Sequence, residues 1–146
     1  MQPIVSMFKS LVAPFQVLAK QMESITKMNP KRVSDEFYVA GQIGYSDLPK
    51  LAEQGFKSII CARPDDEEGN QPRFQDLALE AEKYGIKMLH VPIRPGQACG
   101  ADVDKFAKGY FDMPKPILGY CRSGMRAHSL WELNQEATAM HVPMGK

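Results

Sequence analysis

The sequence predicts an α/β domain whose mostly parallel sheet of about four to five strands is flanked by helices. Short apolar runs rich in β-branched residues alternate with longer segments that have the apolar spacing of amphipathic helices. The chain has 146 residues, 44% of them hydrophobic and 24% charged, which is enough to bury the core of one domain. The alternation of the two periodicities therefore decides the fold class.

Four strands and four helices are expected in alternation. The expected strands cover 37–43, 57–62, 87–93 and 116–121. The expected helices cover 46–55, 73–85, 101–113 and 126–140. Ser46 is expected to cap the first helix, and Gly55 and Gly85 are expected to end the first two helices. Ligands of parallel sheets bind outside the carboxyl ends of the strands, so we expect the functional residues in the loops that follow the last three strands.

A separate N-terminal segment precedes the alternating part. Residues 1–33 are expected to form an amphipathic helical extension of a domain that covers 34–146, with Pro14 as a kink. No uninterrupted apolar run approaches the roughly 20 residues that a membrane span needs, so we expect no membrane partner. We expect the extension to dock on the domain or to join copies of the chain as a homo-oligomer, and an interfacial membrane helix is the alternative.

Charge and cysteine content exclude several classes of protein. The net charge of +1 gives no global attraction to nucleic acid, so we expect no nucleic-acid partner and only local anion binding. The three cysteines, at positions 61, 99 and 121, fit neither a disulfide framework nor a zinc site. We therefore expect a reducing, cytoplasmic location, and neither a metal nor another cofactor.

The stretch "GYCRSGMR", residues 119–126, lies at a predicted strand-to-helix turn. Its backbone amides can point inward, and the start of the helix adds partial positive charge, so the turn can bind an oxyanion. In this field Cys121 is expected to be a thiolate nucleophile, and Arg126 to hold an oxyanion through its paired N–H donors. The expected binding loop between them consists of Arg122, Ser123, Gly124 and Met125. The alternative is a buried structural cysteine beside solvated arginines.

The spacing of this loop leaves two reactions open. Protein tyrosine and dual-specificity phosphatases place five residues between the cysteine and the arginine, whereas four stand between Cys121 and Arg126. Single-domain rhodaneses, which are sulfurtransferases, often carry a "CRSGxR" loop of the length found here. A smaller ring suits the transfer of sulfur better than the transfer of a phosphoryl group.

A longer part of the chain resembles a known family. The stretches "FYVAGQIGYSDLPKLAEQGFKSIICARPDDEEGNQPRF", "VPIRPG" and "YCRSGMRAHSLW" are similar to the bacterial phosphatase-like domain that is also found attached to beta-lactamase-like hydrolases. The resemblance covers roughly residues 35–140 and implies a dual-specificity-phosphatase-like fold. It implies a cysteine-dependent phosphomonoesterase with Cys121 as nucleophile and Arg126 as phosphate ligand. Some members are assigned as sulfurtransferases, so the expected ligand is a phosphate-containing or sulfur-donor small anion, or a phosphoprotein.

The chain departs from the phosphatase pattern at the proton donor. Gln97 stands near the position where such phosphatases place an aspartate, and Asp102 is the nearest carboxylic acid. Asp102 is thus the candidate general acid, with a helix cap as its alternative role. Asp65 and Asp66, which follow the second strand, are a second source of acid, with a solvated turn beside Arg63 as the alternative. Arg63 and Asp65 are also expected on the substrate side of the site.

Three further residues qualify the expected activity. Ala127 replaces the hydroxyl residue that usually assists departure of the cysteine sulfur, so we expect weak phosphatase turnover. Cys99 is either a thiol that resolves an oxidised Cys121 as a disulfide or an incidental surface thiol. His128 either supplies a proton near the site or is structural. The leading interpretation is a phosphatase that forms a thiophosphate on Cys121; a persulfide sulfurtransferase and a non-enzymatic anion-binding or redox-sensing module are the alternatives.

Overall fold

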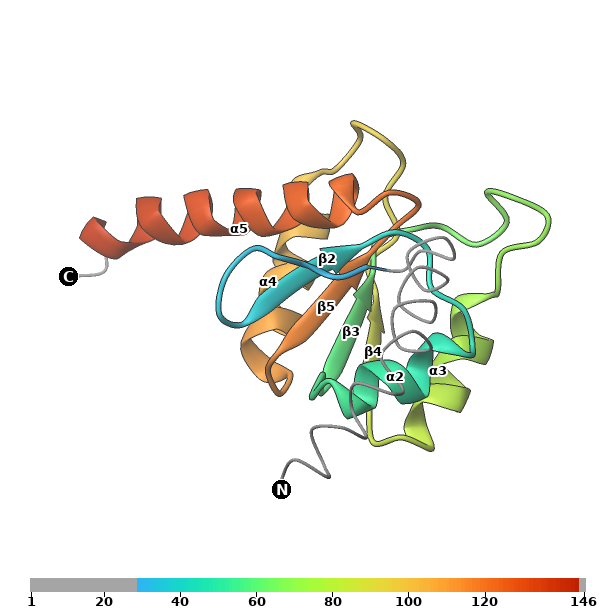
Figure 1. Cartoon of the computed structure of the whole chain (residues 1–146). Coiled ribbons are helices and arrows are strands. Elements are labelled where there is room, and N and C mark those ends of the chain that lie inside the picture. The colour runs from blue at the N-terminus through green and yellow to red at the C-terminus, as the bar shows by residue number, and fades with distance from the viewer. Residues whose placement is uncertain (1–28, 145–146) are drawn as a thin grey trace, which may run out of the picture.

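The protein is a five-stranded sheet with helices on both faces (Figure 1), and the computed structural model describes residues 29–144. The strands are β1 (Lys31–Arg32), β2 (Phe37–Ala40), β3 (Ser58–Cys61), β4 (Lys87–His90) and β5 (Ile117–Tyr120). The helices are α2 (Asp47–Glu53), α3 (Phe74–Glu82), α4 (Gly100–Asp112) and α5 (Met125–Met144). Within residues 29–144, none of the helices combines the length and the apolar character that crossing a membrane requires.

The strand order β1-β2-β5-β3-β4 places the last strand of the chain in the middle of the sheet. Strands β2, β5, β3 and β4 are parallel, and Tyr120 of β5 is in register with Ala40 on one side and Cys61 on the other. The predicted α/β class and mostly parallel sheet are therefore confirmed. The register brings the carboxyl ends of the four parallel strands to one edge, and the chain leaves that edge at positions 41, 62, 91 and 121.

Strand β1 was not expected from the sequence. Lys31 pairs with Val39 and Arg32 with Tyr38, antiparallel to β2. A strand of two exposed residues has no hydrophobic periodicity, so no sequence pattern could reveal it. It lies before the expected domain boundary at residue 34, and the domain therefore begins at or before Lys31. The helix expected within residues 1–28 lies outside the described residues.

The helix ends agree with the sequence at the glycines and differ at Ser46. Gly55 and Gly85 follow α2 and α3 with φ of 99° and 75°, in the left-handed region where glycine carries no Cβ penalty, so they end these helices as expected. Ser46 occupies the N-cap position as expected, but its side chain makes no capping hydrogen bond. It is Asp47 Oδ2 that accepts a hydrogen bond, from the Gly44 amide at 2.7 Å.

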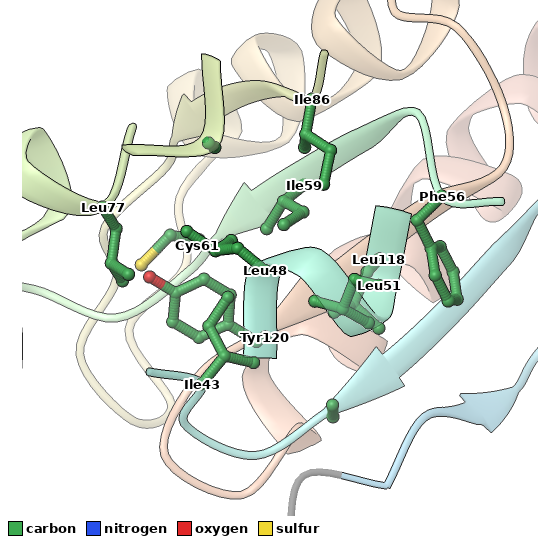
Figure 2. Packing of buried hydrophobic residues seen from close by; sticks show 12 residues of the cluster. Ile43, Leu48, Leu51, Phe56, Ile59, Cys61, Leu77, Ile86, Leu118 and Tyr120 are labelled. Carbon is green, nitrogen blue, oxygen red and sulfur yellow. The ribbon is translucent and has the colours of Figure 1, made fainter. Parts of the chain in front are cut away.

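Each face of the sheet buries its own apolar layer. Figure 2 shows the layer under α2 and α3, where the ring of Tyr120 lies among aliphatic side chains such as Ile43, Leu48 and Leu77. The Tyr120 hydroxyl points toward the sulfur of Cys61 in the same layer. Burial raises the pKa of Cys61 to about 11, which keeps it a protonated thiol near neutral pH. Cys61 is a core residue, with 3% of its surface exposed.

Phe37 is the centre of the layer on the opposite face. Its ring meets Phe106 edge-on at 5.8 Å and stacks on Trp131 at 6.2 Å, and it is fully buried. Because Phe37→Ala removes this ring and leaves a cavity, we expect it to lower the free energy of unfolding by about 3–5 kcal/mol. Urea unfolding measures the change. Phe111→Ala is the control, because Phe111 is 83% exposed, and an equal cost for both variants would contradict the packing argument.

Candidate functional site

The loop between β5 and α5 closes around the sulfur of Cys121. Cys121 is the first residue after β5, and its side chain is fully buried. The Gly124 amide donates a hydrogen bond to Cys121 Sγ at 3.0 Å. Helix α5 begins one residue later, at Met125, so the sulfur lies at the start of a long helix (Figure 1). Amide donors and a helix start both stabilise a negatively charged sulfur.

Two glycines allow this loop to touch the backbone that follows β2. Gly124 has φ of 97°, and a Cβ on it would lie 3.2 Å from the carbonyl oxygen of Ala40. A Cβ on Gly41 would lie 2.9 Å from the carbonyl oxygen of Arg122, and Gln42 N donates to that oxygen at 3.4 Å. The positive φ and the close contact explain why the loop has a glycine at position 124. The role of Gly41 was missed, because close approach to another segment leaves no local signal in the sequence.

Arg126 places its guanidinium beside the sulfur and is itself held by two partners. Its Nη1 donates to the carbonyl oxygen of Ile93 at 2.9 Å and to Glu67 Oε2 at 2.8 Å, and its Nη2 donates to Glu67 Oε1 at 3.1 Å. The hydrogen bond with Glu67, with a further contribution from Cys121, raises the pKa of Arg126 above its ordinary value. Arg126 is therefore a fixed cation that joins the cysteine loop to the loops after β3 and β4.

Arg63 is a second buried cation at the same edge. Its side chain is 1% exposed, its Nε donates to Glu67 Oε1 at 2.8 Å, and its Nη1 donates to Gln42 Oε1 at 2.7 Å. Its Nη2 lies 3.1 Å from Glu68 Oε1, and the other oxygen of Glu68 lies 3.3 Å from Nη2 of Arg122. Three arginines and two glutamates thus form one continuous ion-pair network, which we call the arginine cluster.

Glu67 is the central anion of the arginine cluster. Its hydrogen bond with Arg126 is the main cause that lowers its pKa to about 2, and Arg63 adds to the effect. The carboxylate is therefore charged at neutral pH. Because the folded-state pKa lies below the ordinary value of about 4.3, its stabilising contribution is present above that value and is lost as the pH falls through about 2.

A cavity of about 320 Å³ opens on the arginine cluster. It is lined by Arg63, Glu67, Glu68, Pro95, Arg122 and Arg126. The structure therefore brings together the three arginines that the sequence placed at the site. Guanidinium groups that converge on one opening can bind a tetrahedral oxyanion through paired hydrogen bonds.

The two candidate aspartates make hydrogen bonds at helix starts. Asp65 Oδ1 accepts from the Phe74 amide at 2.8 Å, where α3 begins. Asp102 Oδ2 accepts from the Cys99 amide at 2.9 Å, at the first turn of α4. Neither side chain is among the described residues that line the cavity of the arginine cluster. The capping role that the sequence allowed for Asp102 is therefore present.

Cys99 and His128 lie on the periphery of the site. Cys99 is exposed at the start of α4. His128 stacks on Trp131 at 6.2 Å between ring centroids, and its Nδ1 lies 3.9 Å from Glu132. His128 and Trp131, both on α5, line a second cavity of about 580 Å³, which also borders the cysteine loop at Ser123, Gly124 and Met125. This second cavity offers space beside the cysteine loop for the remainder of a molecule that binds there.

Comparison with known proteins assigns the family. A model of the family described as beta-lactamase hydrolase-like protein, phosphatase-like domain, matches residues 30–138. The chain belongs to this family. A beta-lactamase hydrolase-like protein of Agrobacterium fabrum (strain C58) is 33% identical over 108 residues, which are 74% of this chain and 25% of that protein. Its counterpart in Xylella fastidiosa (strain Temecula1) is 29% identical over 103 residues, 70% of this chain and 24% of that protein.

The phosphatase-like domain thus spans about a quarter of the length of the curated relatives that it matches. Among solved structures, a candidate phosphatase of Neisseria meningitidis Z2491 is similar with a TM-score of 0.68 and 31% identity, covering 73% of this chain and 76% of that one. A mutant form of Tk-PTP has a TM-score of 0.53 and 19% identity, covering 66% of this chain and 62% of that one. The expected family and the phosphatase-like fold are confirmed.

Proposed function

We propose that this phosphatase-like domain is a cysteine-dependent phosphatase that hydrolyses phosphomonoesters. The observation that carries the proposal is the buried Cys121 sulfur, which accepts the Gly124 amide at 3.0 Å beside the Arg126 guanidinium. The family and the fold support a hydrolase of the phosphatase type. The loop amides and Arg126 stabilise both the thiolate and the charge on the transferred phosphoryl group.

The proposed reaction has two steps. The thiolate of Cys121 attacks phosphorus, a sulfur–phosphorus bond forms, and the bond between phosphorus and the leaving oxygen breaks. A proton from a carboxylic acid neutralises the leaving oxygen. Water then attacks the thiophosphate, the sulfur–phosphorus bond breaks, and phosphate leaves as the thiolate is restored. Arg126 stays charged throughout, since it does not lose its proton in proteins.

Asp102 remains the proposed proton donor, because it lies just after the loop whose Pro95 borders the arginine cavity. To donate, it must exchange its hydrogen bond with the Cys99 amide. Asp102→Asn keeps an oxygen that can cap the helix but cannot give a proton, so we expect turnover of an aryl phosphate to fall by about a hundredfold or more. The alkaline limb of the pH profile, where a general acid loses its proton, should flatten while the melting temperature stays the same. An unchanged pH profile would remove Asp102 from the mechanism.

Sulfur transfer through a Cys121 persulfide is the second candidate function. It is favoured by the position of Asp65 and Asp102, which bond to backbone amides at helix starts and do not line the arginine cavity. A persulfide carrier needs no acid for an alkoxide leaving group. Thiosulfate or a related sulfur-donor anion would bind to the same arginines, because it also presents oxygen atoms to the guanidinium donors.

Parallel assays with two substrates discriminate the functions. The protein is incubated with an aryl phosphate and, separately, with thiosulfate plus cyanide, each beside Cys121→Ser. Phosphate release that disappears in the variant is the expected result. Thiocyanate formation without phosphate release would establish sulfur transfer instead. If neither product forms while phosphate still binds, both enzymatic functions fail and an anion-binding module remains.

A further inference from the structure

The carboxylate of Glu67 takes the donors that an oxyanion at this site would also use. It accepts from both Nη atoms of Arg126, at 2.8 and 3.1 Å, and from Nε of Arg63 at 2.8 Å. A carboxylate and a phosphate or sulfate oxygen pair suit the same planar donor fork. Glu67 is the carboxylate that lies on the fork of the arginine next to the nucleophile, so an arriving anion must compete with it.

We propose that Glu67 is an exchangeable internal occupant of the arginine cluster: a tetrahedral oxyanion displaces its carboxylate from Arg126, and the displaced carboxylate takes up a proton. The inference rests on the proposed function, because it concerns the same site, and it adds how that site accepts its anion. Displacement removes the two hydrogen bonds from Arg126, while the side chain stays within reach of Arg63, whose Nε already donates to Glu67 Oε1 at 2.8 Å.

The charges around Glu67 explain the proton. The charged and titratable groups that face it or its partners are Arg63, Glu68, Arg122, Arg126, the Cys121 sulfur and, through the backbone oxygen of Arg63, His90. Three guanidinium groups are balanced by two carboxylates and, in the proposed mechanism, by the thiolate of Cys121. A bound dianion adds two negative charges and no cation, in a partly buried cavity. Protonation of Glu67, whose carboxylate has lost its bonds with Arg126, reduces this crowding.

Linkage gives the direction of the pH effect. The bond with Arg126 is the main cause of the low pKa of Glu67, about 2, and an anion that takes over this arginine removes that cause. The negative charge of the anion also raises the pKa of Glu67. A group whose pKa is higher in the complex than in the free protein binds protons on complex formation, so oxyanion affinity increases as the pH falls.

Sulfate is the probe, because it is a tetrahedral dianion that does not titrate in the useful pH range. Its dissociation constant is measured by calorimetry between about pH 4.5 and pH 7.5 in buffers of different ionisation enthalpy, which also counts the protons taken up. We expect the affinity of the wild type to increase as the pH falls, approaching about tenfold per pH unit at the acid end. In Glu67→Gln we expect sulfate to bind at least about tenfold more tightly at pH 7.5, with little change with pH.

Three variants make the assignment specific. Glu67→Asp keeps a carboxylate and should keep the pH dependence of sulfate binding. This result would show that the effects of Glu67→Gln come from loss of the carboxylate and not from loss of the fold. Cys121→Ser should also keep the pH dependence, because the proton goes to Glu67. Glu80→Gln is the matched control, since its carboxylate pairs with Lys83 at the end of α3 and should leave sulfate binding unchanged.

Four results would overturn the inference. Three concern sulfate binding: weaker or equal binding in Glu67→Gln, a pH dependence that survives in Glu67→Gln, and the absence of binding in both proteins. The fourth is a pH dependence that disappears only in Cys121→Ser, which would assign the proton to the thiol. If the wild type does not hydrolyse an aryl phosphate but shows the expected pH dependence of sulfate binding, the proposed function is rejected and this inference stands.

Discussion

Cys121→Ser is expected to abolish phosphate release from an aryl phosphate while the protein still folds and binds phosphate. The loop around position 121 stabilises an anion through the Gly124 amide and Arg126, and a serine hydroxyl does not ionise near neutral pH. Removal of the nucleophile from an enzyme that forms a covalent intermediate costs at least about a thousandfold in kcat. Steady-state kinetics measure the loss, and calorimetry with phosphate tests whether the cysteine loop still binds the anion.

The other cysteines supply the control for this experiment. Cys99→Ser changes an exposed residue at the start of α4, where serine is a good capping residue, so activity should be unchanged. Cys61 stays protonated because burial raises its pKa to about 11, so it does not provide a substitute thiolate. Equal loss of activity in Cys99→Ser and Cys121→Ser would contradict the assignment of Cys121 as the only nucleophile.

Arg126→Lys should lower kcat/KM for an aryl phosphate by about a hundredfold to a thousandfold. The guanidinium of Arg126 donates to Ile93 and Glu67 from a planar fork, and a lysine ammonium cannot reproduce these directions together with an oxyanion contact. The loss should appear mainly in kcat if the contact strengthens as charge develops on the transferred group.

Arg122→Lys is the matched control, because it makes the same chemical change at the other end of the loop. Arg122 is 69% exposed and makes one ion pair with Glu68 at 3.3 Å, and such pairs contribute little. We expect its kcat/KM to stay within about threefold of the wild type. If Arg126→Lys keeps full activity, general positive charge and not the placement of the Arg126 guanidinium determines anion binding; if the two lysine variants lose activity equally, the guanidinium of Arg126 has no special role.

Local signals in the sequence predicted the fold and the loop at its centre. The alternation of strand and helix periodicities needs only neighbouring residues, and it located the four helices and the four parallel strands of the described part of the chain. Cys121, Gly124 and Arg126 stand close together in the chain, so their spacing alone indicated an anion-binding loop. The structure also places Arg63 with Arg122 and Arg126, as the sequence suggested, because the strands they follow end at one edge.

The parts that the sequence did not reveal depend on contacts between distant segments. "RPDDEEGNQP" contains four consecutive acids, and nothing in their order shows that Glu67 bonds to Arg126, 59 residues away, while Asp65 bonds to the start of α3. Strand β1 is too short to carry a pattern. One signal for Glu67 was usable: it stands in a run of acidic residues after a buried strand. Such a run favours contacts with cations from other parts of the fold.

The backbone contact at Gly41 and Gly124 limits how the cysteine loop can change its length. A methyl group on Gly41 would collide with the carbonyl oxygen of Arg122, and one on Gly124 would press against that of Ala40. An engineered insertion that restores the five-residue spacing of tyrosine phosphatases must therefore expand toward solvent, on the side of Ser123 and Met125. Such an insertion would widen the cysteine loop on its exposed side and leave its contact with the backbone after β2 in place, whichever residue is inserted.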